Sequence, residues 1–382
     1  SLLDPKKLND ENEKINYHNI PAELAWEMNL PLPDGYKFIV LGFGLSASLA
    51  FYEFCKKIGI NFCFDYYNIK INNKSIFLHI YNDSDIKKHN KLFFLTTKIP
   101  YLCLVSDPIS RIKRGINHGW WKYEHQRHYD EYKLFDNIDY VLDRVIYPDC
   151  RDYNTFCKQI QSWIDLPSFN YSCLEKKAKQ FVIIDSSEIM PTMILDTLNK
   201  IGKRFNFEIE IKNNDYFFEI KASEFRYILP IKFCFNIENI NARINLTLKH
   251  EIPNNCIEIN DFLNLMSLEY SDKICFSMNK NDIHLLYKLK NRQDIIQYFQ
   301  MFVVKLKDKI LKLDLLKATE NMILECMQSN SYLAKRLSKK IKKDVLFIKQ
   351  HRPDIVASWK YYQEFEKMCK ELDGDCVGKT TE

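Results

Sequence analysis

The sequence lacks the patterns that mark membrane, secreted and zinc-binding proteins. No run approaches about 18 consecutive apolar residues, and no charged segment followed by an apolar one opens the chain, so we expect neither a membrane span nor a signal peptide. The 12 cysteines include no CxxC pair, which argues against a zinc site and a secreted disulfide framework. We therefore expect a cytoplasmic protein without a bound metal. Because the sequence begins abruptly with SLLDPKK, we also expect it to be part of a longer chain.

A strong excess of one charge is also missing. The 382 residues include 55 Lys and Arg against 50 Asp and Glu, which gives a formal net charge of +5. This excess is too small and too dispersed for a dedicated nucleic-acid-binding protein, so we expect no nucleic-acid partner. Lys-rich segments such as LAKRLSKKIKK are either solvated helix faces or surfaces that attract a polyanionic glycan or a membrane. Anion binding must otherwise depend on local clusters of basic residues.

Strand-like and helix-like segments alternate through the first half of the chain. The segment 36–44 is an apolar run that ends in glycines, and 46–60 has the periodicity of a helix. Further strand candidates are 76–82, 91–96, 101–106 and 181–190. Buried apolar strands that alternate with helices predict an α/β fold, a parallel sheet with helices on both faces.

Composition and periodicity divide the chain into four parts. Residues 1–35 form a polar N-terminal arm, and 36–206 form the α/β core, with an insertion at about 120–175. Short alternating segments separated by Asn-rich turns predict an antiparallel, β-rich insertion over 207–290. The region 291–382 is helical, Lys-rich and amphipathic, and we expect it to return to the core.

The stretch LGFGLSAS lies between the first predicted strand and the following helix. Glycines at this point allow backbone N–H groups to face a ligand at the positive end of the helix dipole, where phosphate binds well. The stretch does not spell GxGxxG and lacks the Lys-Ser/Thr pair of a nucleoside triphosphatase loop, so a plain glycine turn with an N-cap serine is the alternative. The candidate ligand-binding residues are Gly42, Gly44, Leu45, Ser46, Ala47 and Ser48.

A cluster of basic residues follows the strand candidate 101–106. In SDPISRIKRG, Asp107-Pro108 forces a turn, and Arg111 and Arg114 are three apart on one face of the next helix. Guanidinium groups bind phosphate through paired, charge-assisted hydrogen bonds, so a second phosphate is the expected partner. The alternative is a solvated basic helix face.

These motifs, in this order, resemble the sulfotransferase-fold family, whose members transfer a sulfuryl group from 3′-phosphoadenosine 5′-phosphosulfate (PAPS) to a hydroxyl. FIVLGFGLSASLAFYEFCKKIGI has the layout of the family's 5′-phosphosulfate loop, and SDPISRIKR is similar to its Arg-Asp-Pro-x-x-Arg motif for the 3′-phosphate. RPDIVASW keeps Arg352 and Trp359 at the family's Arg-to-Trp spacing, and VIIDSSEIMPTMILDTLNKIGKRFNF is similar to its strand-Pro-helix segment. The resemblance implies a sulfotransferase-like fold. It places Ser106, Arg111, Arg114 and Arg352 at the donor.

The sequence departs from that family at three points. Ser106 stands where the family has its first Arg, Arg114 stands where it has a Ser, and the loop lacks the usual Lys and Thr. These departures leave open which donor is bound. They do not change the expectation that the donor is a nucleotide with two separate phosphate groups.

A closer resemblance involves both ends of the sequence. INYHNIPAELAWEMNLPLPDGYKFIVLGFG and SWKYYQEFEKMCKELDG are similar to a bacterial family of unknown-function domains found in putative capsular sugar transferases. Some members are taken to transfer O-methyl phosphoramidate from a 3′-phosphorylated cytidine diphosphate carrier. The resemblance implies such a donor, or PAPS, and a capsular polysaccharide as acceptor. It also implies peripheral association with a membrane-bound capsule assembly complex.

Histidines and aromatic residues supply the remaining candidates. We expect His118 to be the base that accepts the hydroxyl proton, because it follows the basic turn and its pKa suits neutral pH, with His79 as second choice. Trp120, Trp121 and Tyr123 either stack on sugar rings or form a lid packed on the core. The β-rich insertion is the other candidate acceptor surface.

Three alternative functions stay open. The nearest is a PAPS-dependent carbohydrate sulfotransferase. A nucleotide-sugar glycosyltransferase is disfavoured because no DxD motif follows a core strand, NDSD at 82–85 being the closest text. The third is a non-catalytic glycan-binding module that retains the fold.

Overall fold

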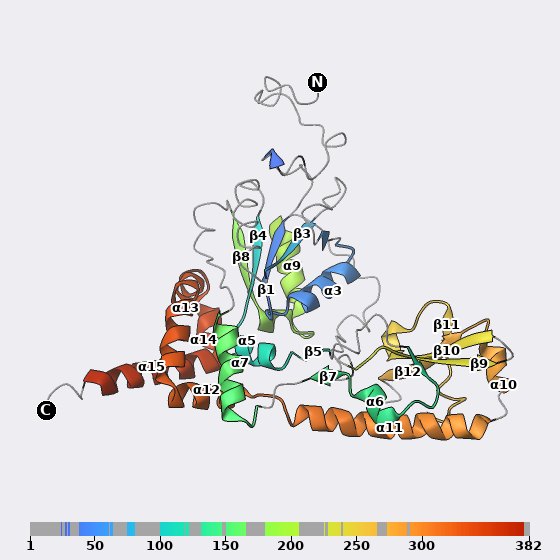
Figure 1. The fold of residues 1–382 in the computed structure, drawn as a ribbon. Coiled ribbons are helices and arrows are strands. Elements are labelled where there is room, and N and C mark those ends of the chain that lie inside the picture. The colour runs from blue at the N-terminus through green and yellow to red at the C-terminus, as the bar shows by residue number, and fades with distance from the viewer. Residues whose placement is uncertain are drawn as a thin grey trace, which may run out of the picture. The chain divides into compact units, whose positions relative to one another are not determined.

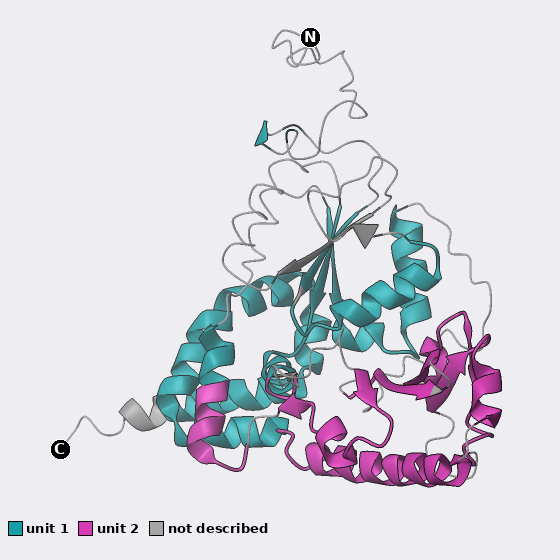
Figure 2. Ribbon diagram, turned by 45° about the vertical axis from the view of Figure 1, so that its right-hand side comes forward, with its two compact units in different colours: residues 1–115, 160–220, 319–382 teal, residues 116–159, 221–318 magenta. Residues whose placement is uncertain are grey.

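The chain forms two compact units. The computed structural model describes residues 24, 27–28, 30, 38–60, 62–63, 75–80, 100–118, 120–121, 131–146, 150–165, 180–205, 225, 228–237, 240–265, 273–288 and 291–377. Unit 1 comprises 1–115, 160–220 and 319–382, and unit 2 comprises 116–159 and 221–318 (Figure 2).

Unit 1 is built on a parallel five-stranded sheet with the order β2-β3-β1-β4-β8 (Figure 1). Its strands are β1 (Ile39–Phe43), β2 (Phe62–Cys63), β3 (Ser75–Ile80), β4 (Tyr101–Val105) and β8 (Phe181–Asp185). All four pairings are parallel, and every residue of β4 is buried, as its continuous apolar run predicts. The predicted parallel sheet is therefore confirmed.

The strand order reverses beside β1. From β1 the chain continues to β2 and β3 on one side of that strand, and it then returns to β4 on the other side. In an open parallel sheet, ligands bind outside the carboxyl ends of the strands at such a switch point. The loops that follow β1 and β4 therefore meet where a ligand site is expected.

Helices flank this sheet. They are α3 (Ser48–Lys57), α5 (Pro108–Ile116), the end of α7 (Tyr153–Asp165), the 3-10 turn η3 (Ser186–Ile189) and α9 (Ile194–Phe205). Phe51 and Phe54 of α3 and Leu198 of α9 form one buried cluster with Val40 and Leu104. Helices α3 and α9 thus cover one face of the sheet through the alternate side chains of β1 and β4.

The C-terminal region is helical, as predicted. It contains α12 (Glu320–Ser329), α13 (Ser331–His351), α14 (Pro353–Ser358) and α15 (Lys360–Val377). Thr319 caps α12 through Met322 N at 3.2 Å, and Asn330 caps α13 through Leu333 N at 3.3 Å. Pro353 starts α14, a position at which its missing N–H costs little.

Unit 2 contains a second five-stranded sheet with the order β11-β12-β10-β9-β6. Its strands are β6 (Glu131–Lys133), β9 (Ile231–Ile237), β10 (Ile240–Leu248), β11 (Cys256–Glu258) and β12 (Ile274–Asn279). The last four pair antiparallel, as the alternating pattern predicts, but β6 joins β9 in parallel. Unit 2 also contains the helices α6 (Ile138–Leu142), α10 (Ile283–Tyr287) and α11 (Arg292–Asp314), the 3-10 turn η5 (Lys249–Glu251), and the short pair β5 (Trp120–Trp121) and β7 (Val145–Ile146).

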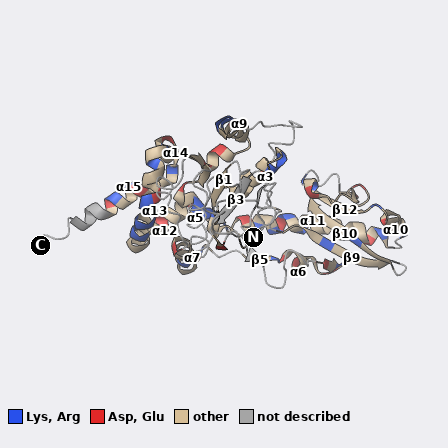
Figure 3. Cartoon of the chain, turned by 90° about the horizontal axis from the view of Figure 1, so that it is seen from above, with Lys and Arg blue, Asp and Glu red and all other residues tan. Residues whose placement is uncertain are grey.

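Helix α11 packs on this second sheet through its apolar stripe. The Phe233 ring lies 5.1 Å from Phe299 and 5.2 Å from Phe302 between centroids, and Phe276 lies 4.9 Å from Phe299. Acidic and basic positions are interspersed along the helix (Figure 3). The aromatic contacts of α11 with the second sheet explain why the boundaries of the two units differ from the domain boundaries expected from the sequence. Helix α11 lies in unit 2, so the chain re-enters unit 1 at 319 and not at 291.

The insertion expected at about 120–175 is also divided between the units. Residues up to 159 belong to unit 2, and residues from 160 belong to unit 1. The expected arm 1–35 lies almost wholly outside the described residues. In the part of the chain that the structure describes, no helix has both the length and the apolar composition needed to cross a membrane.

Candidate functional site

The loop between β1 and α3 has an unusual backbone. Leu45 has φ 71° and Ala47 has φ 60°, both in the left-handed region, where a residue with a Cβ is strained by about 1–3 kcal/mol. Gly42 lies inside β1, paired with His79 and Leu104. The left-handed backbone of this loop thus lies at Leu45 and Ala47, and Gly42 is part of the strand. Strain of this kind persists only where surrounding contacts fix it.

Arg114 of α5 supplies such a contact. Its guanidinium donates hydrogen bonds to the Leu45 carbonyl and, at 3.4 Å, to Ser186 Oγ at the end of β8. Burial lowers the pKa of Arg114, and the nearby Asp185 carboxylate acts against that effect. Arg114 thus ties the strained loop to the neighbouring strand, and the structure places it on protein acceptors.

Helix α3 begins beside this loop without a side-chain cap. Its N-cap residue is Ala47, and no side chain caps the helix. The alternative of an N-cap serine, Ser46 or Ser48, is therefore not seen, although both side chains are buried. The first N–H groups of a helix have no partner within the helix, so they are suited to bind an anion.

A small pocket of about 50 Å³ opens in unit 1 at the carboxyl edge of the sheet. Ser46, Ser106 and Arg111 line it from the strand ends and α5, and Trp163 and Lys340 line it from α7 and α13. A pocket of this volume has room for a phosphate-sized group. Candidate residues from two motifs about 60 residues apart, Ser46 from one and Ser106 and Arg111 from the other, are thus brought together.

The hydroxyl of Ser106 is the most informative group in this pocket. The side chain is only 7% exposed, and among the described residues its Oγ has no hydrogen-bond partner. A buried polar group without a partner costs about 1–3 kcal/mol. Thr247 and Ser277 of unit 2 also have buried hydroxyls without a partner among the described residues, but of these three residues only Ser106 lines this pocket. A bound ligand or a water molecule can satisfy such a group.

Asp107 is structural, although it belongs to the same motif. Its Oδ1 accepts hydrogen bonds from Ile109 N at 2.8 Å and Ser110 N at 3.2 Å, which caps α5. Its Oδ2 accepts from Tyr362 N at 3.0 Å and so fixes the start of α15. Burial raises the pKa of Asp107, although these backbone bonds act in the opposite direction.

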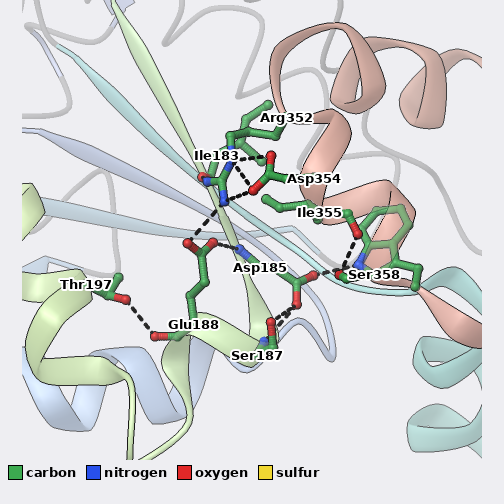
Figure 4. A network of polar contacts seen from close by, with 10 residues as sticks. Ile183, Asp185, Ser187, Glu188, Thr197, Arg352, Asp354, Ile355 and Ser358 are labelled. Atoms are coloured by element: carbon green, nitrogen blue, oxygen red, sulfur yellow. Dashed lines mark hydrogen bonds and ion pairs between the residues drawn. The ribbon is translucent and has the colours of Figure 1, made fainter.

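Arg352 lies in a network of protein contacts (Figure 4). Nε donates to Asp354 Oδ1 at 2.9 Å, Nη1 to the Ile183 carbonyl at 2.8 Å, and Nη2 to Glu188 Oε1 at 3.2 Å and Asp354 Oδ2 at 2.8 Å. The hydrogen bonds to Asp354 raise the pKa of the guanidinium, and burial opposes that shift. Every nitrogen of Arg352 is thus engaged, and the residue does not line the pocket.

Trp359 also connects the C-terminal helices to the end of β8. Its indole Nε1 donates to Asp185 Oδ1 at 2.8 Å, while Asp185 Oδ2 accepts from Ser187 N at 2.8 Å and Ser187 Oγ at 2.7 Å. Arg352 and Trp359, whose spacing was recognised in the sequence, therefore fasten α14 to the end of β8. Trp359 also lines the pocket.

The expected bases and sugar-stacking residues are described only in part. His118 follows α5 in unit 2, where its side chain is exposed. His79 lies in β3, and Trp120 and Trp121 form β5, but only the backbone of these three is described. Tyr123 lies outside the described residues.

Sequence reasoning missed the contribution of α13 to the pocket. Lys340 and Asp344 line it from a segment that reads as a solvated, Lys-rich helix face. The only available signal was the apolar periodicity of Leu337, Ile341 and Ile348, which also line the pocket.

Comparison with known proteins gives a family match. Residues 183–372 match a family described as "Protein of unknown function (DUF2972)". No curated protein and no solved structure matches the chain. This match confirms the expected resemblance to a family of unknown-function domains. The matched segment includes the network around Arg352 and Trp359 and ends before α15 does.

Proposed function

We propose that the protein is a group transferase that binds a phosphorylated nucleotide donor at the carboxyl edge of the parallel sheet in unit 1. The observation that carries the proposal is the buried, unpartnered hydroxyl of Ser106 in a pocket that Arg111 also lines. Phosphate oxygens would accept hydrogen bonds from that hydroxyl and from the guanidinium. The switch point of a parallel sheet is also where such ligands bind.

The donor we propose is a 3′-phosphorylated nucleotide, of the cytidine diphosphoramidate type or PAPS. The pocket has room for a phosphate-sized group, and its polar lining comprises two serine hydroxyls, the Arg111 guanidinium, Lys340 and Asp344. Such a donor supplies an activated phosphoryl-type or sulfuryl group. The choice of a 3′-phosphorylated nucleotide rests on the resemblance of SDPISRIKR and LGFGLSAS to the sulfotransferase-fold motifs.

The residues of unit 1 would divide the work of binding. Arg111 and Ser106 contact the phosphate, and the uncapped start of α3 adds partial positive charge. Arg114 keeps the loop in its strained shape and is a positioning residue. Preorganised donors of this kind stabilise the negative charge that develops during group transfer.

The acceptor we propose is a sugar hydroxyl of a capsular polysaccharide. This part rests on the resemblance of the two ends of the sequence to a family of unknown-function domains found in capsular sugar transferases. His118, or else His79, is the proposed base. A role at a membrane-bound capsule assembly complex in the cytoplasm belongs to the same proposal.

Thermal unfolding with a panel of nucleotides tests the donor class. The probes are cytidine 3′,5′-bisphosphate, adenosine 3′,5′-bisphosphate, cytidine diphosphate and uridine diphosphate glucose. We expect a 3′-phosphorylated probe to stabilise the chain most, by about 2.7 kcal/mol at 100 times its Kd. Arg111→Ala should remove this stabilisation, while Arg204→Ala, an exposed arginine on α9, should leave it unchanged.

Two results would contradict the proposal. Equal or greater stabilisation by the nucleotide sugar would favour a glycosyltransferase. No stabilisation by any probe at millimolar concentration would favour a non-catalytic module.

A further inference from the structure

Unit 2 has an open groove at one edge of its sheet. It encloses about 470 Å³ between the turn after β6, the hairpin of β9 and β10, and the start of α11. Six of the residues that line it are Lys133, Phe135, Phe235, Asn236, Asn241 and Asn291. All belong to unit 2, so the groove is a feature of that unit by itself.

Side-chain amides dominate the polar lining of this groove. Asn236 and Asn241 face each other in the register of β9 and β10, and Asn236 Nδ2 donates to Asn241 Oδ1 at 3.0 Å. Among the described residues, this bond leaves Asn236 Oδ1 and both N–H groups of Asn241 without a partner. Asn291 stands at the start of α11, but its side chain makes no capping bond to that helix. The groove therefore offers acceptors and donors side by side.

An aromatic ring is held at the same groove by a strained turn. Phe135 has φ 73°, a conformation that a bulky side chain rarely adopts, and 46% of the residue is exposed. Leu134 N donates to the Cys234 carbonyl at 3.0 Å, and Lys133 N donates to Asp136 Oδ2 at 2.7 Å. The turn thus keeps a partly exposed apolar ring at the surface.

Tyr298 of α11 braces this ring. The two ring centroids are 5.4 Å apart in an edge-to-face arrangement, and the Tyr298 hydroxyl donates to the Asp136 carbonyl at 3.0 Å. Burial raises the pKa of that hydroxyl well above its ordinary value, so it stays protonated and donating. A preorganised aromatic surface loses little entropy when a ligand binds.

We infer that this groove binds a sugar ring of the acceptor polysaccharide. Sugar hydroxyls both donate and accept hydrogen bonds, and side-chain amides do the same. A row of amides therefore suits a sugar better than a row of like charges. The C–H face of a pyranose ring is apolar and suits the exposed Phe135 ring, and Lys133 would favour a sugar that carries a carboxylate. The inference rests on the proposed function, because it assigns the groove to the acceptor of that reaction.

Saturation-transfer NMR on the full chain tests the groove directly. The probes are methyl galactopyranoside, methyl N-acetylgalactosaminide and methyl glucuronide, with cytidine as a stacking ligand that has no pyranose. We expect transfer to the ring protons of at least one glycoside. Phe135→Ala and Asn241→Ala should each weaken that glycoside's binding tenfold or more. Tyr287→Ala is the matched control, because Tyr287 is 71% exposed in unit 2 and meets Phe262 edge-to-face at 5.7 Å.

The outcomes separate this inference from the proposed function. Absence of transfer to every glycoside, or transfer unchanged in both variants, would overturn the inference. Cytidine binding that Phe135→Ala abolishes, without glycoside binding, would overturn it as well. Nucleotide-dependent thermal stabilisation that persists in Phe135→Ala would still support the donor site of unit 1. Glycoside binding in a chain that ignores every nucleotide would support the groove and contradict the transferase.

Discussion

Replacing Ser106 by alanine should separate ligand binding from folding. The substitution removes a hydroxyl that is 7% exposed and has no partner among the described residues. An unsatisfied buried polar group costs about 1–3 kcal/mol, so we expect Ser106→Ala to raise the free energy of unfolding by about 1 kcal/mol. A hydrogen bond to a charged phosphate is worth about 1.5–3 kcal/mol, so nucleotide affinity should fall about 10- to 100-fold.

Two measurements on the same preparations check this prediction. Urea denaturation without ligand gives the change in stability, and titration calorimetry with cytidine or adenosine 3′,5′-bisphosphate gives the change in affinity. The reasoning is refuted if Ser106→Ala loses more than about 1 kcal/mol of stability while its affinity stays the same. That result would mean that the hydroxyl bonds to the protein and has no role in the pocket.

Three further substitutions test other contacts of unit 1. A Cβ at Gly115 would lie 2.3 Å from the Trp163 ring, so Gly115→Ala should cost about 1–3 kcal/mol in urea denaturation; full stability would contradict this packing. Arg352→Lys loses the bidentate contact with Asp354, so it should lower stability by about 1–3 kcal/mol. Its nucleotide affinity by calorimetry should stay within about threefold, because every Arg352 nitrogen is bound to protein, and a tenfold loss would instead return Arg352 to the donor site. The pKa of Glu320 is lowered: burial raises it, but the contacts with Lys113 at 2.7 Å outweigh burial. A lowered folded-state pKa gives stability that is present above the unfolded value of about 4.3 and is lost as pH falls through the folded value. Glu320→Gln should therefore lose less stability than the wild type on acidification across that range, and parallel pH profiles would count against it.

The sequence predicted the sheet of unit 1 well because burial on both faces leaves a plain signal. The segments that became β1, β4 and β8 are continuous apolar runs, and parallel pairing follows from the helices between them. The strand order, and with it the switch point beside β1, depends on contacts between distant segments and could not be read from the sequence. For the same reason, the sequence did not predict β6, a three-residue strand that pairs with β9 from a different part of the chain.

The candidate site was predicted only in part. Ser46, Ser106 and Arg111 meet at one pocket because they follow strands that end at the same edge. The spacing of Arg352 and Trp359 was visible, but their partners Glu188 and Asp185 lie more than 160 residues earlier, so their role in attaching α14 was not. Left-handed Leu45 and Ala47 carry no sequence signal, since residues with a Cβ seldom adopt that conformation.

The most direct test of the donor site is a crystal structure of the full chain with cytidine or adenosine 3′,5′-bisphosphate. We predict a phosphate oxygen at about 3 Å from Ser106 Oγ, with a second contact from the Arg111 guanidinium. A nucleotide whose phosphates bind on another surface, with the Ser106 pocket filled by protein side chains, would contradict the account.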